Sequence, residues 1–130
     1  MIKTLIVDDN NLFRCQIKRM LETNSDIEII GEAVDGQDAV RKARALQPDV
    51  VLMDIRLPGM NGIEATTILR RIMPDVKIVM LTIYDIDEYR EAAKTCGVSC
   101  FILKKSLKTE LVPAIKEAFA SQSVHTQSNI

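Results

Sequence analysis

Four apolar residues in a row, two of them β-branched, occupy Val50–Met53 and lead directly into Asp54. Such a run is typical of a strand buried on both faces, as found in parallel sheets that helices cover on both sides. In open parallel α/β sheets, functional groups lie at the carboxyl ends of the strands. We therefore expect the Asp54 carboxylate to lie at the functional edge of a sheet.

Three other short apolar runs also end on polar or charged residues. These runs and the residues that follow them are Leu5–Val7 with Asp8 and Asp9, Ile78–Leu81 with Thr82, and Phe101–Leu103 with Lys104. If the four strands are parallel, their carboxyl ends share one edge of the sheet. The sequence thus predicts that three carboxylates, a hydroxyl and an ammonium group converge at that edge.

Helical patterns separate the predicted strands, with apolar residues every three or four positions. The predicted helices lie between Asn11 and Thr23, between Gly36 and Gln47, before Pro74, between Asp85 and Gly97, and from about Thr109 onward. Their inward faces are predicted to include Leu46 and Ile72, and the short polar side chains of Asp8–Asn11 can cap the first helix. The shorter, charged run Ile27–Ile30 is predicted to be an edge strand. Five strands alternating with five helices predict an α/β fold, a doubly wound parallel sheet in three layers.

Two helix boundaries depend on particular residues. Asp85 and Glu88 resemble a capping box for the fourth helix, and Gly97 is expected to end that helix in a left-handed conformation. Pro113 inside a helix would cost roughly 3 kcal/mol. The last helix is therefore predicted to begin late, near Thr109.

Composition and charge limit the possible functions. The chain has 130 residues, fits one domain, and is 47% hydrophobic, as expected of a folded protein. A net charge of -1 gives no reason to expect nucleic-acid binding by this segment, and the apolar runs are too short to span a membrane. No signal peptide precedes the first strand, so the cytoplasm is the expected compartment. Residues 1–120 are predicted to form the domain, and the polar stretch 121–130 a disordered tail or the start of a linker.

The cysteines and the single histidine argue against several kinds of chemistry. Cys15, Cys96 and Cys100 lie within apolar patterns and lack metal-ligand spacing, so we expect small hydrophobic side chains rather than redox groups. His125 lies in the polar C-terminal stretch. This placement argues against a histidine base or a zinc site with a histidine ligand.

The groups predicted at the sheet edge suit phosphoryl chemistry. Asp8, Asp9 and Asp54 are hard oxygen ligands, which match Mg²⁺ or Mn²⁺. The cation, the Lys104 ammonium and the Thr82 hydroxyl could each bind one equatorial oxygen of a phosphoryl group. One carboxylate then remains to attack phosphorus, and Asp54 on the central strand is the best candidate, because aspartyl phosphate is a recognised covalent intermediate. Taken singly, a strand-end Asp is more often a helix cap.

The same residues in this spacing resemble the receiver domain of two-component response regulators. The resemblance covers about Ile2–Ala120 and rests on Asp8–Asp9, on Asp54 with the loop Leu57–Gly62, on Thr82, and on Phe101 with Lys104. It implies a flavodoxin-like, five-stranded parallel sheet in the order 2-1-3-4-5 and phosphoryl transfer from a histidine kinase to Asp54. It also implies Mg²⁺ held by Asp9, Asp54 and the backbone carbonyl of Arg56, with help from Asp8.

The resemblance further implies a switch. Thr82 and Phe101 match the family's switch pair, in which phosphorylation draws the hydroxyl inward and the aromatic ring follows. The face built from the fourth helix, fifth strand and fifth helix is then remodelled and controls an output domain or target protein; a homodimer also fits the family. Phe101 lacks a phenolic hydroxyl, so any switching must rely on ring packing. The alternative is a fixed core aromatic.

Details of the chain are most similar to receivers of the NarL/FixJ type, which usually precede a helix-turn-helix DNA-binding domain. The residues after Ala120 are too few to form one, so control of transcription would act through a domain absent from this sequence. Arg56 and Tyr84 each follow a site residue by two positions and are bulky enough to limit access to Asp54. Alternatively, both side chains point to solvent.

Two other classes of function compete with this interpretation. A haloacid-dehalogenase-like phosphatase also uses an aspartate nucleophile and Mg²⁺, but it needs a second Asp two residues after the nucleophile, where this chain has Arg56. We therefore expect that the chain is not an enzyme. It is expected to be a phosphoacceptor domain that promotes only its own phosphorylation and dephosphorylation. A stand-alone receiver, or a protein-binding module that is never phosphorylated, stays open.

Overall fold

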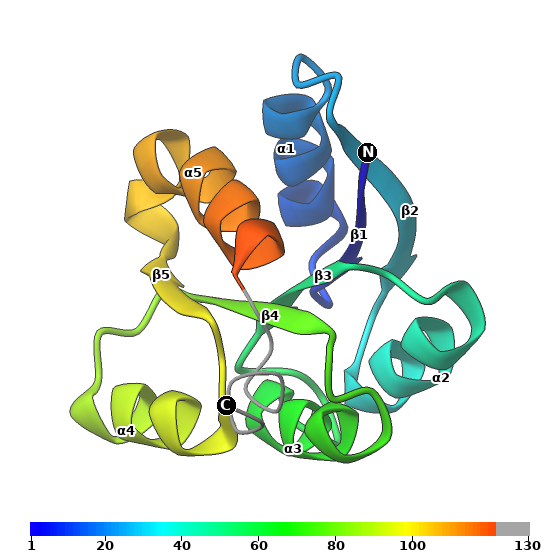
Figure 1. Cartoon of the computed structure of the whole chain (residues 1–130). Coiled ribbons are helices and arrows are strands. Elements are labelled where there is room, and N and C mark those ends of the chain that lie inside the picture. Colours follow the sequence, from blue (N-terminus) through cyan, green and yellow to red (C-terminus); the bar gives the residue numbers. More distant parts are fainter. Residues whose placement is uncertain (122–130) are drawn as a thin grey trace.

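The computed structural model describes residues 1–121, in which a sheet lies between two layers of helices (Figure 1). The strands are β1 (Ile2–Val7), β2 (Ile27–Ala33), β3 (Val50–Asp54), β4 (Lys77–Thr82) and β5 (Cys100–Leu103). The helices are α1 (Asn11–Leu21), α2 (Gly36–Leu46), α3 (Gly62–Ile72), α4 (Asp87–Cys96) and α5 (Leu107–Ala120), and a 3₁₀ turn at Lys104–Ser106 precedes α5.

The five strands form one sheet in the order β2-β1-β3-β4-β5, and all neighbouring strands are parallel. The central strand β3 is buried along its whole length, as its apolar sequence predicts. These findings confirm the predicted α/β fold, the three layers and the order 2-1-3-4-5. None of the helices within residues 1–121 is both long and apolar enough to cross a membrane.

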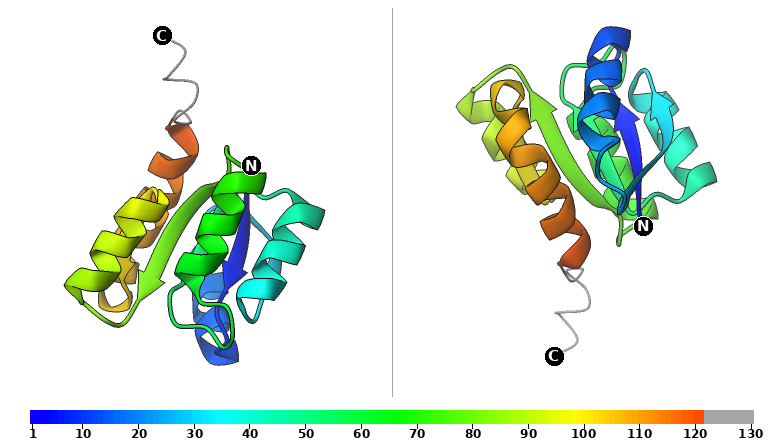
Figure 2. Two further views of the ribbon diagram at one scale, coloured as in Figure 1. Left: turned by 90° about the horizontal axis from the view of Figure 1, so that it is seen from below. Right: turned by 90° about the horizontal axis from the view of Figure 1, so that it is seen from above.

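Alternate strand residues supply two separate cores. Leu52 faces the core shared with α1 and α5, whereas its neighbours Val51 and Met53 face the core shared with α2, α3 and α4. Figure 2 shows these two helical layers on opposite faces of the sheet. The helices complete the cores with buried residues such as Ile17 of α1 and Leu69 of α3. This period of two follows from the geometry of a strand.

Several local predictions are confirmed. Gly97 ends α4 in a left-handed conformation with φ of 86°. The Asn10 side chain caps α1 by accepting a hydrogen bond from the backbone N–H of Phe13 (3.0 Å). The cysteines at positions 15, 96 and 100 are all free and partly buried.

The prediction that Leu46 and Ile72 face inward is wrong, because 39% and 44% of their respective surfaces are exposed. Each is the last residue of its helix, at the margin of the helical layer. Leu46 lies over Gly31 of the edge strand, where a Cβ would come within 2.7 Å of the leucine Cδ1. Its outer side therefore has no further strand to cover.

The predicted boundaries of two helices are also wrong. Helix α4 begins at Asp87, its N-cap residue Ile86 makes no side-chain cap, and Asp85 instead pairs with Arg90 (2.9 Å). Helix α5 begins at Leu107 and contains Pro113. Pro113 lies on the exposed face, so the carbonyl that loses its N–H donor can be hydrated, while buried residues on the other face hold the helix to the sheet.

The predicted tail, residues 121–130, lies outside the described residues apart from Ser121, and so does His125.

Candidate functional site

The ends of four strands bring together the side chains that the sequence predicted to converge. Asp54 is the last residue of β3 and Thr82 the last residue of β4, while Asp8 follows β1 and Lys104 follows β5. Because all strands are parallel, these positions share the carboxyl edge of the sheet. The buried apolar residues of neighbouring strands pair with one another, and this pairing brings the strand ends together. In the ladder between β1 and β3, for example, Val7 pairs with Met53.

Lys104 joins two of the carboxylates. Its ammonium nitrogen lies 2.8 Å from Oδ2 of Asp8 and 3.2 Å from Oδ2 of Asp54. Asp8 and Asp54 are almost entirely buried, with 1% and 7% of their surfaces exposed. In such surroundings both ion pairs are much less screened by water than surface pairs.

Asp9 completes an acidic cluster with Asp8 and Asp54. One carboxylate oxygen from each residue lies within 4.8 Å of the others. The Asp9 side chain is exposed and makes no hydrogen bond or ion pair within the described part of the chain, so its oxygens are free to bind a ligand. The all-oxygen donor set and its spacing fit a hard divalent cation such as Mg²⁺.

Burial and the neighbouring charges act in opposite directions on Asp54. Burial raises the pKa of the Asp54 carboxyl from 3.8 to about 6, although the Lys104 ammonium opposes the rise. The nearby Asp8 carboxylate adds to it. The Asp54 carboxyl is therefore ionised at neutral pH, but its ionised form is less stable than that of an exposed carboxyl. The positive charge of a bound cation would stabilise the ionised form.

Asp8 is held from all sides. Its Oδ1 accepts a hydrogen bond from the backbone N–H of Asn10 (2.8 Å), and its backbone carbonyl accepts one from Nη1 of Arg14 (2.7 Å). Its own N–H donates to the carbonyl of Ala33 (3.1 Å). With Lys104 on the second carboxylate oxygen, every polar group of Asp8 has a partner.

Thr82 is completely buried, and its hydroxyl oxygen accepts a hydrogen bond from the backbone N–H of Tyr84 (3.1 Å). The Arg56 guanidinium stacks on the Tyr84 ring at 4.7 Å, and of the two residues Arg56 is exposed and Tyr84 partly buried. The backbone N–H of Arg56 also lies 3.4 Å from Oδ1 of Asp54. The proposed role of its backbone carbonyl in metal binding stays a prediction.

A cavity of about 380 Å³ opens over this cluster. It is lined by Asp8, Asp9, Asn10, Phe13, Asp54, Arg56, Ile83, Tyr84 and Lys104. Its lining thus includes the three acidic residues and Lys104, together with the bulky Arg56 and Tyr84. The cavity therefore gives a small anionic group a path to Asp54, past residues that limit its width.

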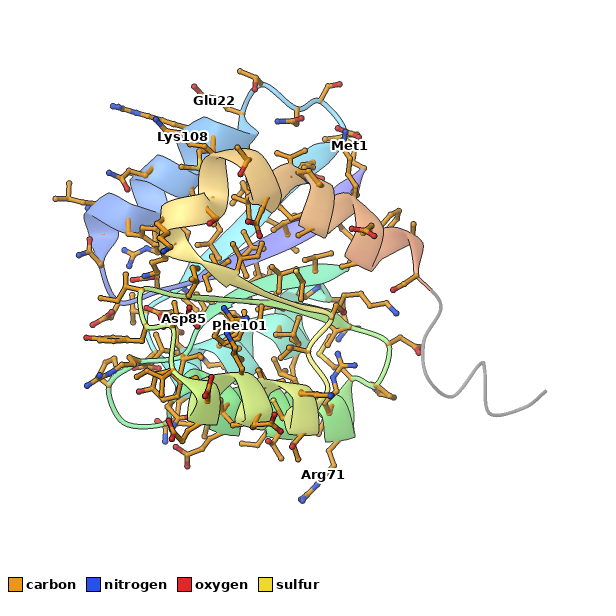
Figure 3. All side chains as sticks on the ribbon, turned by 90° about the vertical axis from the view of Figure 1, so that its left-hand side faces the viewer. Met1, Glu22, Arg71, Asp85, Phe101 and Lys108 are labelled. Carbon is orange, nitrogen blue, oxygen red and sulfur yellow. The ribbon has the colours of Figure 1, made fainter. Side chains whose placement is uncertain are left out.

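Phe101 lies on the same face of the sheet as Thr82. Thr82 pairs with Leu103 and Met80 pairs with Phe101, and residues two apart on a strand point to the same side. The Phe101 ring lies on the side that α4 covers (Figure 3), partly buried beneath the Arg90 guanidinium at 4.7 Å. Arg90 is in turn held by Asp85, so the ring is linked to the loop before α4.

Sequence reasoning missed several residues around the site. Phe13 was expected only in the apolar stripe of α1, but the Lys104 ammonium lies 3.8 Å from the centre of its ring. Arg14 and Arg90 were not singled out at all. Apart from the bond of Arg14 to Asn11 on its own helix, their partners lie on other elements or beyond a helix turn, and no local spacing reports such contacts.

A doubly wound sheet in this order, with a carboxylate cluster and a lysine at its carboxyl edge, defines a receiver-type signalling domain. The family described as "Response regulator receiver domain" matches residues 4–116, and the chain belongs to this family.

Individual relatives agree. The chain is 41% identical over 122 residues to the response regulator GacA of Pseudomonas aeruginosa, covering 94% of this chain and 57% of the relative. A two-component response regulator of the LuxR family from Aurantimonas has a similar structure, with a TM-score of 0.89, 32% identity, and coverage of 95% of this chain and 88% of that chain. A DNA-binding response regulator of the LuxR family from Staphylococcus aureus gives 0.86 and 28%, with coverage of 92% and 99%. The chain thus spans less than two thirds of the length of the relative GacA.

Proposed function

We propose that this domain is a phosphorylation-dependent switch whose phosphoacceptor is Asp54. The observation that carries the proposal is the buried Asp54 carboxylate at the end of the central strand, beside Lys104 and within a cluster of three acidic residues. The domain would accept its phosphoryl group from a histidine kinase. A carboxylate oxygen of Asp54 forms a bond to phosphorus as the phosphorus–nitrogen bond of the phosphohistidine breaks, and the released imidazole takes up a proton.

The surrounding residues have complementary roles in this proposal. Asp9 and Asp54, with Asp8 and the Arg56 carbonyl, would hold Mg²⁺, which when bound supplies positive charge for the phosphoryl oxygens. The Lys104 ammonium binds a second oxygen and the Thr82 hydroxyl a third. Water later cleaves the acyl phosphate, which regenerates the carboxylate and releases inorganic phosphate. The domain therefore promotes only its own phosphorylation and dephosphorylation.

The switch would reach the surface through Thr82 and Phe101. The Thr82 hydroxyl leaves the N–H of Tyr84 when it binds the phosphoryl group, and this movement frees space on the face that Phe101 shares. Because Phe101 lacks a hydroxyl, the Arg90 guanidinium on its ring supplies the link to α4. The remodelled face is formed by α4, β5 and α5, where an output domain or target protein, or a second copy of the chain, would bind.

The output is most simply control of transcription. One structural neighbour is itself a DNA-binding response regulator, and this chain spans only part of the length of its relative GacA. The DNA-binding function would belong to a separate domain, since the net charge of -1 of this chain offers no attraction to DNA. The cytoplasm, where a histidine kinase presents its phosphohistidine, is the proposed compartment.

The intact mass of the protein tests the phosphoacceptor. Wild type and Asp54→Asn are incubated with acetyl phosphate and Mg²⁺, and a second pair of samples contains EDTA instead. A phosphoryl-sized mass gain is expected only for wild type with Mg²⁺. Asp26 pairs with Lys116 and is not among the residues that line the cavity over the acidic cluster. Asp26→Asn therefore serves as the matched control and should label as wild type does.

The same experiment separates the alternative. A receiver fold that binds partners without phosphorylation would gain no mass from acetyl phosphate or from a phosphorylated histidine kinase. Equal labelling of wild type and Asp54→Asn would instead show that another residue is the acceptor.

A further inference from the structure

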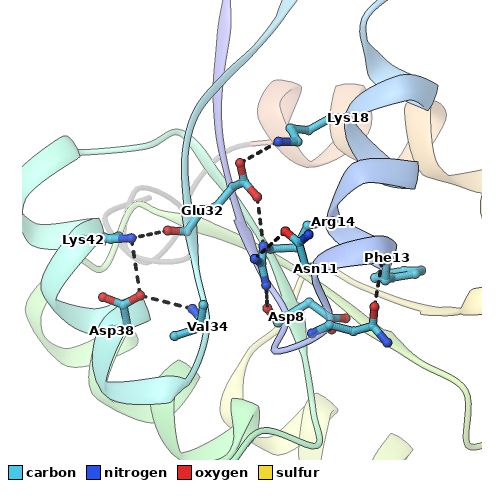
Figure 4. A network of polar contacts seen from close by, with 10 residues as sticks. Asp8, Asn11, Phe13, Arg14, Lys18, Glu32, Val34, Asp38 and Lys42 are labelled. Atoms are coloured by element: carbon cyan, nitrogen blue, oxygen red, sulfur yellow. Dashed lines mark hydrogen bonds and ion pairs between the residues drawn. The ribbon is translucent and has the colours of Figure 1, made fainter.

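The Arg14 side chain lies within a polar network that joins Asp8, one of the three acidic residues of the cluster, to Glu32 and Lys18 (Figure 4). Its Nη1 donates to the backbone carbonyl of Asp8 (2.7 Å), its Nη2 to Oδ1 of Asn11 (3.1 Å), and its Nε to Oε1 of Glu32 (2.9 Å). Only 11% of the side chain is exposed. A guanidinium bound at three nitrogens and largely excluded from water has little freedom to move.

The bond to the Asp8 carbonyl matters because of where that carbonyl is. It belongs to the peptide that joins Asp8 to Asp9, so fixing it fixes the direction in which the Asp9 side chain leaves the backbone. Asp9 has no side-chain partner of its own in residues 1–121. The position of its carboxylate, relative to those of Asp8 and Asp54, therefore depends on the backbone that Arg14 holds.

Glu32 pairs with Arg14 and offsets its positive charge, which would otherwise repel a cation at the acidic cluster. The side chain comes from the edge strand β2, and besides Arg14 it binds Nζ of Lys18 (2.8 Å). The hydrogen bond from Lys18, together with Arg14, lowers the pKa of the Glu32 carboxyl, so the side chain stays ionised. Lys42 binds the Glu32 backbone carbonyl and fixes the strand at the same place.

We propose that Arg14 is a positioning residue for the metal site, which orients the Asp8–Asp9 peptide while Glu32 neutralises its charge. The inference rests on the proposed function, since it concerns the cation that Asp8, Asp9 and Asp54 would hold. Residues that orient metal ligands typically change metal affinity 10- to 100-fold when they are replaced.

The sign of the effect separates positioning from simple electrostatics. Arg14→Gln removes a positive charge close to three carboxylates, so charge alone would make Mg²⁺ bind more tightly. Loss of positioning makes Mg²⁺ bind more weakly, by about tenfold. Lys18→Gln is the matched control, because it removes the same charge and another bond to Glu32 but makes no contact with the Asp8 turn.

The test is titration of the phosphate-free protein with Mg²⁺, followed by calorimetry and by the amide NMR signals of Asp8, Asp9 and Asp54. We expect Arg14→Gln to bind about tenfold more weakly and Lys18→Gln to stay within about twofold of wild type. Binding to Arg14→Gln that equals or exceeds wild-type affinity would overturn the inference, as would equal losses in both variants.

Two further arms keep the outcome clear. Arg14→Lys retains the charge but cannot donate to three acceptors in this geometry, so it should also bind Mg²⁺ more weakly; it decides the case if Arg14→Gln fails to fold. If wild type itself binds no Mg²⁺, the metal site is refuted and the positioning role with it. Wild-type binding with unchanged Arg14 variants refutes the positioning role alone.

Discussion

Replacing Asp54 by asparagine should stabilise the metal-free protein. Burial raises the pKa of this carboxyl from 3.8 to about 6, so the ionised form costs the folded state about 3 kcal/mol at pH 7.5, at about 1.4 kcal/mol per pKa unit. Asparagine resembles the protonated carboxyl and avoids this cost, and the hydrogen bond from Lys104 is already included in the raised pKa. The expected gain is about 3 kcal/mol, or roughly 9 to 15 °C in the midpoint of thermal unfolding.

The gain should depend on pH in a defined direction. Because the folded pKa is raised, the unfolded chain ionises first as pH increases, and stability is lost between about pH 4 and pH 6. At pH 4.5 the folded carboxyl is almost entirely protonated, and its cost relative to the unfolded chain falls to about 1 kcal/mol. Wild type and Asp54→Asn should therefore differ in stability by only about 1 kcal/mol at pH 4.5 and by most above pH 7.

Urea unfolding in EDTA at pH 4.5 and pH 7.5 measures both differences. Asp26→Asn is the control of opposite sign, because the surface ion pair with Lys116 lowers the pKa of Asp26, and its replacement should not stabilise the protein. Asp54→Asn that is no more stable than wild type at pH 7.5 would refute the reasoning. A gain of the same size at both pH values would show that its origin is not the ionisation of Asp54.

Two other substitutions test the geometry around Asp54. Tyr84→Ala should widen the cavity and release the Arg56 guanidinium, so labelling by acetyl phosphate should become several-fold faster. Tyr89→Ala removes the edge contact to the Tyr84 ring at 6.3 Å and part of the core packing but no residue that lines the cavity, so it should have a smaller effect on the rate. A slower rate in Tyr84→Ala would contradict a restricting role. Gly62→Ala would place a Cβ 2.0 Å from the backbone carbonyl oxygen of Asp54, so urea unfolding should show a loss of about 3 kcal/mol or more, whereas Gly59→Ala, with open space but φ of 69°, should lose only about 1 kcal/mol.

The sheet could be predicted because its information is local. Runs such as Val50–Met53 are apolar at every position, and only a strand covered on both faces buries all of them. The polar residue after each run then marks the carboxyl edge, so convergence of Asp54 and Lys104 follows from parallel pairing alone. The strand order itself came from the resemblance to receiver domains, since apolar runs do not specify their neighbours.

Other features could not be predicted because they depend on partners distant in the sequence. Asp85 is a residue type that often caps helices, but here its carboxylate pairs with the charged Arg90, which is a stronger interaction than a cap to a backbone N–H. Helix α4 therefore begins at Asp87 without a side-chain cap. Pro113 is unfavourable in a helix considered alone, but α5 packs its opposite face on the sheet and tolerates it. In each case a tertiary contact outweighs the local preference.

Asp8 and Asp9, two members of the acidic cluster, differ in how firmly the surrounding structure holds them. Asp8 has a partner at every polar group, whereas the Asp9 side chain has none in the described structure. If all the ligands were fixed, their positions could not adjust to the coordination that the cation prefers. If all the ligands were mobile, ordering their side chains would cost free energy and weaken binding of the cation. A rigid Asp8, tied to Arg14 and Lys104, beside an open Asp9 combines an ordered backbone with an accessible carboxylate. Affinity for the cation should therefore depend on Arg14, which holds the Asp8 carbonyl, as well as on the carboxylates that would bind the cation.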